Sequence, residues 1–224
     1  MKAVTEAEWL ACTDPKPMLE FLRGKASDRK LRLFACACCR RVWHLLADER
    51  SREAIRIAER FADGDSSSDE LEATYRPAVA ACHEAEGGAH FAAAGTAERS
   101  ATDAARYAAY GVGAGLRPWP GLWGVELKAV EEAHASLVRE VFGNPFRPVT
   151  TSSSSQSPQV VALAQAAYDE RELPAGTLDL ARLAVLADAL EEAGCTAQTI
   201  LDHLRGPGPH VRGCWAVDLI LGKE

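Results

Sequence analysis

The chain has 224 residues, of which 47% are hydrophobic, and 25 Lys and Arg stand against 32 Asp and Glu for a formal net charge of −7 at pH 7. This balance is typical of a globular protein, and the net acidity argues against a general coat for nucleic acid. We find no secretory signal segment at the start and no run of roughly 18 apolar residues that could span a membrane. We therefore expect a cytoplasmic protein without membrane association.

The predicted elements are all helices. Thr5-x-x-Glu8 is a capping box that predicts a short first helix. Apolar residues at helical spacing, with caps at the ends, predict further helices over residues 15–24, 31–46, 49–62, 125–142, 158–171, 179–193, 197–205 and 211–221. No stretch shows the alternation of a strand. The fold class is therefore all-α, a multi-helix bundle with a small helical C-terminal lobe.

The domain boundaries follow from composition. Residues 69–115 are rich in Ala, and we expect Pro77 and Gly87-Gly88 to break or kink the helices there. Residues 150–157 are almost all Ser and Thr, which is typical of a flexible linker. The sequence therefore predicts a helical domain over 1–149, with a variable segment at 69–115, then the linker, then a small helical lobe over 158–224.

Several segments, among them Asp28-Arg-Lys-Leu-Arg-Leu-Phe-Ala-Cys-Ala-Cys-Cys and His210-Val-Arg-Gly-Cys-Trp, resemble a paralogous, uncharacterised family of planctomycete proteins. The other matching segments are Glu6–Pro15, Met18–Arg23, Gly143–Pro148 and Leu186–Cys195. The resemblance touches both ends of the chain. It implies a helical fold and implies no mechanism.

The seven cysteines include the close group Cys36, Cys38 and Cys39, which raises the question of a metal site. At 100° per residue Cys38 falls in the apolar sector of its helix, Cys39 at the edge and Cys36 on the shoulder, while His44 points away. Structural zinc usually takes two ligand pairs on turns, and no second pair is evident. We interpret the three as packing thiols. No other motif indicates a metal or a cofactor, so the sequence predicts neither.

The basic run over residues 23–41 is the best candidate for contact with nucleic acid. Arg29, Arg32 and Arg40 share one sector of the helical wheel and could contact phosphates. The alternative is that these residues are the ordinary outward face of an amphipathic helix.

The segment from Gly206 to Trp215 is the most unusual local sequence. Two Gly-Pro steps hold His210 and Arg212 on a stiff turn before an apolar helix. These two residues and Trp215 could form a recognition surface for a protein partner. Alternatively, Trp215 and the following apolar residues fill a core. With no catalytic motif in the chain, the sequence favours a non-enzymatic protein-interaction module. A nucleic-acid-binding protein is the first alternative and an unrecognised enzyme is the second.

Overall fold

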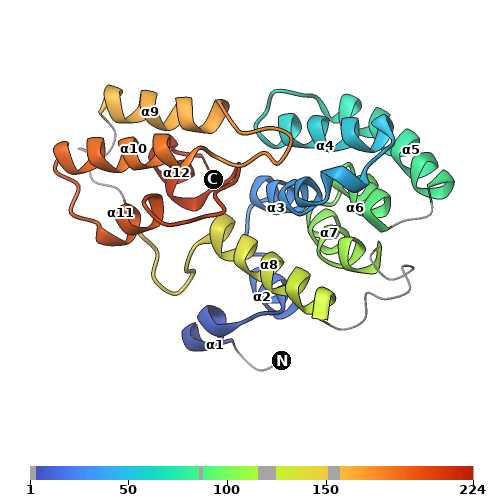
Figure 1. Cartoon of the computed structure of the whole chain (residues 1–224), viewed down its shortest axis with the longest axis horizontal. Helices are drawn as coiled ribbons and strands as arrows, with labels where there is room; N and C mark the ends of the chain where they lie inside the picture. Colours follow the sequence, from blue (N-terminus) through green and yellow to red (C-terminus); the bar gives the residue numbers. More distant parts are fainter. Residues whose placement is uncertain (1–3, 86–87, 116–124, 151–156, 224) are drawn as a thin grey trace. The chain divides into compact units, whose positions relative to one another are not determined.

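The computed structural model describes residues 4–85, 88–115, 125–150 and 157–223. These residues form twelve α-helices and one short 3-10 helix (Figure 1), which confirms the predicted all-α class. The helices are α1 (Glu6–Ala11), α2 (Pro15–Leu22), α3 (Asp28–Arg41), η1 (Trp43–Leu45), α4 (Glu49–Ala62), α5 (Ser68–Glu84), α6 (Gly88–Thr96), α7 (Ala101–Gly115), α8 (Val125–Phe142), α9 (Pro158–Asp169), α10 (Leu180–Glu192), α11 (Gln198–Leu204) and α12 (Trp215–Leu221). None of the described helices is long and apolar enough to cross a membrane.

The chain packs as two units, Met1–Val138 and Arg139–Glu224, which we call unit 1 and unit 2. The division falls inside α8 and therefore upstream of the boundary expected at residue 149. Residues that we assigned to the first domain belong to the second, and Val149 packs on the core of unit 2. Residues 151–156 of the expected linker lie outside the described residues.

Two helices differ from the prediction for local reasons. The helix expected over 31–46 ends at Arg41 and is followed by η1. In the segment expected to break at Pro77, α5 runs through that residue without ending. Pro77 lies on the exposed side of α5. The carbonyl that loses its N–H partner there can therefore bond water, which limits the cost of the proline.

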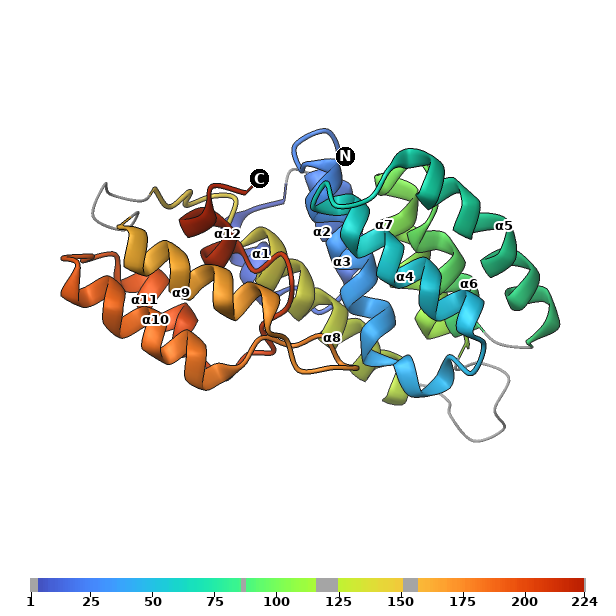
Figure 2. The same cartoon turned by 90° about the horizontal axis from the view of Figure 1, so that it is seen from above.

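The core of unit 1 is built around α3, whose residues 31–40 are all buried. This helix packs against α4, α6 and α7, as Figures 1 and 2 show. The contact between α6 and α7 depends on small residues. A Cβ atom on Gly95 would lie 2.7 Å from Cβ of Tyr107, so the two helices approach as closely as a glycine allows.

The core of unit 2 is a separate cluster contributed by α9 to α12 and their connections. Its largest fully buried side chains are Tyr168, Leu183, Leu186, Leu190 and Ile200. Between α9 and α10 the chain makes a tight turn, with a bridge from Glu172 to Thr177, and Thr177 also bridges to Val211. This second bridge fixes the segment that precedes α12 against the turn.

Candidate metal centre

Unit 2 brings together four side chains that can each offer one ligand atom to a metal ion: Glu140, His203, His210 and Cys214. Glu140 lies in the last turn of α8, His203 in the last turn of α11, and Cys214 is the N-cap residue of α12. His210 lies in the connection between α11 and α12. That connection turns at Gly208, which has a positive φ of 73°, so the Gly-Pro steps direct His210 back toward α8.

The ligand atoms of the four side chains lie within 4.8 Å of one another. Nε2 of His203 is 3.2 Å from Sγ of Cys214 and 3.3 Å from Oε2 of Glu140. Nδ1 of His210 is 3.3 Å from both carboxylate oxygens of Glu140. The backbone N–H of Val211 also donates to Oε1 of Glu140, at 3.3 Å. The glutamate is therefore the centre of the group.

These separations are longer than charge-assisted hydrogen bonds, which are about 2.7–2.9 Å. The buried pair of Arg40 and Glu59 in unit 1 has such short bonds, at 2.8 and 2.7 Å. In a tetrahedral zinc site with bonds of about 2.0–2.3 Å, neighbouring ligand atoms are about 3.4–3.6 Å apart. The distances from Glu140 to the two histidines and from Cys214 to His203 are close to this ligand-to-ligand separation. A metal would draw the most distant pair together by about 1 Å.

The ring of His210 is oriented as a metal ligand usually is. Its Nε2 faces the backbone carbonyl of Gly206 at 3.3 Å, so the proton on Nε2 donates to that oxygen and Nδ1 is left toward Glu140. A metal-bound histidine commonly donates its second ring N–H to a carbonyl or carboxylate, which fixes the tautomer and the ring plane.

His203 has a different neighbour at its second nitrogen. The indole Nε1 of Trp215 donates to Nδ1 of His203 at 3.2 Å. Because an indole can only donate, this bond places the ring proton of a neutral His203 on Nε2, toward Glu140 and Cys214. A metal on Nε2 would move that proton to Nδ1, where it would face the indole N–H. The indole hydrogen bond and metal binding therefore compete at His203.

Three members of the group are buried, with only 2% of the His210 side chain and 8% of the Glu140 side chain exposed, and His203 is partly buried with 19% of its side chain exposed. Burial raises the pKa of the Cys214 thiol well above its usual range, and Glu140 adds to the effect. Burial also lowers the pKa of His203. At His210 burial opposes protonation, but the hydrogen bond and charge of Glu140 outweigh it and the pKa is raised. A bound cation would supply the positive charge that a Cys214 thiolate needs here.

The closing segment predicted as a recognition surface faces inward instead. His210 is buried against Glu140, and the Arg212 guanidinium lies 5.1 Å from the centre of the Tyr168 ring. Trp215 is half-buried and bonded to His203. His210 is therefore buried and cannot belong to the predicted recognition surface, because α8 supplies its partner within the chain. Arg212 and Trp215 are partly exposed, and their role in such a surface stays a prediction.

The basic face predicted for nucleic acid is also turned inward. Arg32 is 2% exposed and donates to the carbonyls of Thr96, Glu98 and Arg99 at 2.6, 2.8 and 3.1 Å, where it caps the end of α6. Arg40 is 6% exposed and forms the two short bonds to Glu59.

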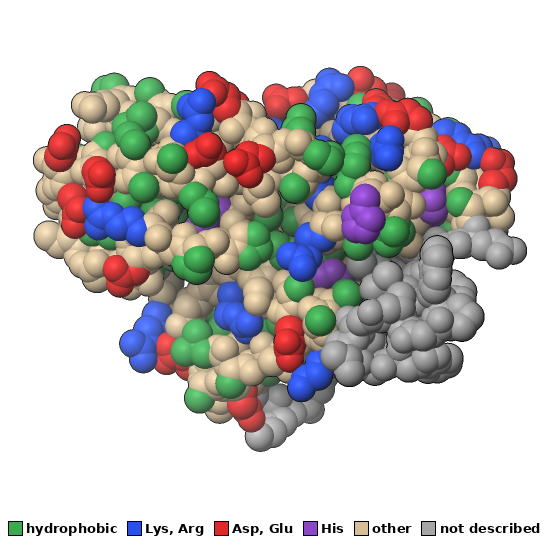
Figure 3. All heavy atoms as spheres, viewed as in Figure 1, with side chains coloured by type: hydrophobic (Ala, Val, Ile, Leu, Met, Phe, Trp, Pro, Cys, Tyr) green, Lys and Arg blue, Asp and Glu red, His purple; other side chains and the backbone are tan. Residues whose placement is uncertain are grey.

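Arg29, the third residue of that face, donates to Asp63 at 2.8 Å. The three arginines are therefore occupied inside unit 1 and cannot form the expected phosphate-binding face. On the side of the molecule in Figure 3, the described basic and acidic side chains are interspersed rather than gathered by sign.

Cys36, Cys38 and Cys39 are all buried in α3, as expected for Cys38. Cys36 differs from the expectation, because it is buried rather than placed on a shoulder. Within the described residues these three thiols join no group of metal-binding side chains.

Sequence reasoning missed three of the four residues in the centre: Glu140, His203 and Cys214. A signal was present, since His203, His210 and Cys214 fall within one short stretch that contains a rigid Gly-Pro turn. Their spacing matches no common zinc motif, however, and Glu140 is too far away in sequence to be paired with them.

In comparisons with known proteins, no protein-family model, no curated protein and no solved structure matches this chain.

Proposed function

We propose that unit 2 is a zinc-binding helical module in which Glu140, His203, His210 and Cys214 hold the metal. The observation that carries the proposal is the convergence of four ligand atoms from α8, α11, the following turn and the α12 cap, within 4.8 Å of one another, three of them on buried residues and His203 on a partly buried one. Two imidazoles, one thiol and one carboxylate are a donor set that suits Zn²⁺, because nitrogen and sulfur ligands select against Mg²⁺ and Ca²⁺.

The role that this geometry supports is structural. Four protein ligands fill the tetrahedron of a zinc ion, whereas catalytic zinc keeps one position for water or substrate. The metal would join the end of α8 to residues 203–214. At a free zinc concentration 100 times the dissociation constant, binding would add about 2.7 kcal/mol to the stability of the folded unit.

A structural metal is consistent with a non-enzymatic interaction module. Leu173, Leu180 and Val185 of unit 2 are each at least half exposed, so apolar side chains are available on this unit for contact with a partner. The partner of such a module is a protein, and the zinc would set the shape of the surface offered to it.

The test is the metal content of the full chain, purified from cells supplied with zinc and handled without chelator. We expect elemental analysis by inductively coupled plasma mass spectrometry to find one zinc ion per chain. Cys214→Ser should lose most of it, whereas Cys195→Ser should keep it. Cys195 is a matched control because it is a buried cysteine of the same unit outside the centre.

A second measurement replaces zinc with Co²⁺, whose thiolate charge-transfer absorption reports the Cys214 bond directly. Wild type and Cys195→Ser should show the band and Cys214→Ser should not. The proposal fails if refolding wild type with zinc yields less than a tenth of an equivalent, or if Cys214→Ser holds zinc as well as Cys195→Ser.

A further inference from the structure

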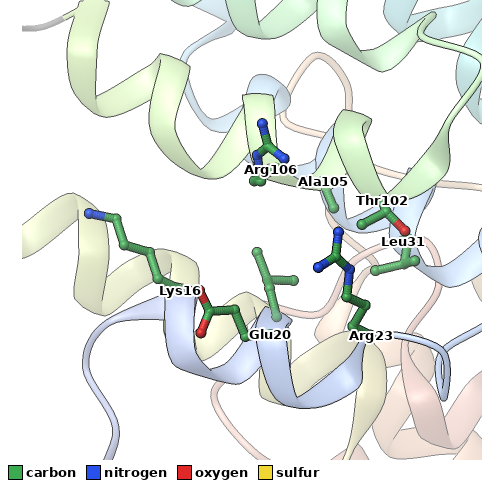
Figure 4. Close-up of a pocket in the computed structure, with 8 residues that line it drawn as sticks. Lys16, Glu20, Arg23, Leu31, Thr102, Ala105 and Arg106 are labelled. Atoms are coloured by element: carbon green, nitrogen blue, oxygen red, sulfur yellow. The ribbon is translucent and has the colours of Figure 1, made fainter. Parts of the chain in front are cut away.

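Unit 1 contains a cavity of about 150 Å³ where α2, the first turn of α3 and the start of α7 meet (Figure 4). The apolar part of its lining consists of Leu19, Leu31 and Ala105. Leu31 is 6% exposed and Ala105 is 1% exposed, so these two residues form the floor of the cavity. A cavity of this volume can hold a molecule about as large as benzene.

The polar part of the lining includes three cationic side chains, Lys16, Arg23 and Arg106. Arg23, at the end of α2, and Arg106, on α7, both line the cavity and are exposed, so they lie at its mouth. In Figure 4 the guanidinium of Arg23 extends from α2 toward α7. The two arginines therefore approach the mouth from different helices.

The two arginines at the mouth differ in how far a neighbouring carboxylate neutralises their positive charge. Arg106 lies 3.3 Å from the carboxylate of Asp103, which neutralises part of its charge. The Arg23 guanidinium has no ion pair with any carboxylate of the described residues. Glu20 also lines the cavity and opposes a bound anion, while Lys16 extends away from Arg23 in Figure 4. Arg23 is therefore the main attraction for an anion.

We propose that this cavity binds a small organic monoanion, a carboxylate on an apolar body about the size of a benzene ring. The apolar body would lie on Leu31 and Ala105, and the carboxylate would meet the planar fork of Arg23, whose geometry matches two carboxylate oxygens. Thr102 adds a hydroxyl to the lining. A bare inorganic anion fits less well, because the apolar floor offers its remaining oxygens no hydrogen-bond donor.

The test compares benzoate with benzamide, which has nearly the same shape and no charge, by calorimetric titration of the full chain. Benzoate should bind saturably and at least tenfold more tightly than benzamide. Arg23→Met keeps an unbranched apolar stem, removes the guanidinium charge, and should remove this preference. Glu20→Gln should strengthen the binding of benzoate, because it removes the opposing charge.

Lys25→Met is the matched control. Lys25 lies two residues from Arg23 and its ammonium is 3.4 Å from the centre of the Phe21 ring, but it does not line the cavity. The Lys25→Met variant should bind benzoate as tightly as wild type. Absence of saturable benzoate binding, equal affinity for benzamide, or an unchanged preference in Arg23→Met would overturn the proposal. Tighter binding of inorganic phosphate than of benzoate would overturn the claim that the ligand has an apolar body. None of these outcomes depends on the zinc centre of unit 2.

Discussion

Oε2 of Glu140 lies 3.3 Å from Nε2 of His203, so that the last turns of α8 and α11 meet at one carboxylate. These two residues are far apart in sequence, and a metal between them would close a long loop of chain. Much of the stability of unit 2 would then depend on the metal, because the unfolded chain has no preformed site.

Glu140→Gln tests this dependence. The amide is a poor zinc ligand and introduces N–H donors beside His203 and His210, so we expect zinc affinity to fall by at least tenfold. Added zinc should raise the melting temperature of wild type and have little effect on the variant. Glu170→Gln is the control, because Glu170 is a surface residue of unit 2 paired with Arg182. Equal responses of the two variants to zinc would contradict the prediction.

Trp215→Phe should bind zinc more tightly than wild type. The indole hydrogen bond to Nδ1 of His203 must be given up when the metal takes Nε2. A typical hydrogen bond contributes about 1 kcal/mol net, so its removal should improve affinity by about fivefold. Competition against a chromogenic chelator measures this change. Weaker zinc binding in Trp215→Phe would show that the indole supports the metal-bound ring.

Arg40→Met should destabilise unit 1 by about 3–5 kcal/mol, because Glu59 would be left buried without its partner. The double variant Arg40→Met with Glu59→Leu should recover most of that loss. Arg56→Met removes a pair with Glu49 and Glu53 at the surface and should cost no more than about 1 kcal/mol. Urea denaturation provides the comparison, and a mild effect of Arg40→Met alone would mean that the pair is solvated.

Cys38→Ala should cost about 1 kcal/mol, since little volume is lost and alanine favours the helix. Cys38→Asp should be severe, because a buried carboxylate would have no partner. Cys36→Asp should now be comparably severe, since Cys36 is also buried. Burial raises the pKa of the Cys38 thiol above its usual range, so labelling of the native protein should be slow. Rapid labelling together with a wild-type midpoint for Cys38→Asp would reverse the face assigned to α3.

His134 should make unit 1 sensitive to acid. Burial, helped by the nearby charge of Arg41, lowers its pKa to about 4. Among the described residues its Nδ1 has no hydrogen-bond partner. The unfolded chain binds a proton on this histidine below about pH 6.5 and the folded chain does not, so stability falls as the pH drops from about 6.5 to 4, by up to about 3 kcal/mol.

The variant His134→Gln cannot titrate and should lose less stability over this range than wild type. The free energy of unfolding, measured in urea at several pH values, gives the two slopes. Parallel slopes for the two proteins would assign the acid sensitivity to other groups.

Most of the helical framework could be predicted from the sequence because its signals are local. The capping box of Thr5 and Glu8 is present, α4 has the predicted bounds, and Gly143 ends α8 at a positive φ. The prediction of a break or kink at Pro77 did not take into account which side of α5 this residue lies on. Pro77 is exposed, and α5 continues through it. The division into units could not be predicted from composition, because Val149 belongs to unit 2 through its packing against the core of that unit.

The candidate centre could not be predicted for the same reason. The sequence indicates that His210 is unusual, but nothing local pairs it with Glu140. The helical wheel placed Arg32 and Arg40 outside the apolar sector of α3 and could not indicate that α6 and α4 would cover them. Burial on all sides of a helix depends on neighbours that are distant in sequence.

The backbone around His210 has a further consequence. The amide of Leu178 donates to the carbonyl of His210 at 2.9 Å, next to the bridge between Thr177 and Val211. Any loosening of the ligand turn therefore exposes an amide on a different segment, one that contributes no ligand. Hydrogen–deuterium exchange at Leu178 would slow when the centre is occupied and accelerate when it is emptied, so this single peptide group reports occupancy from outside the coordination sphere.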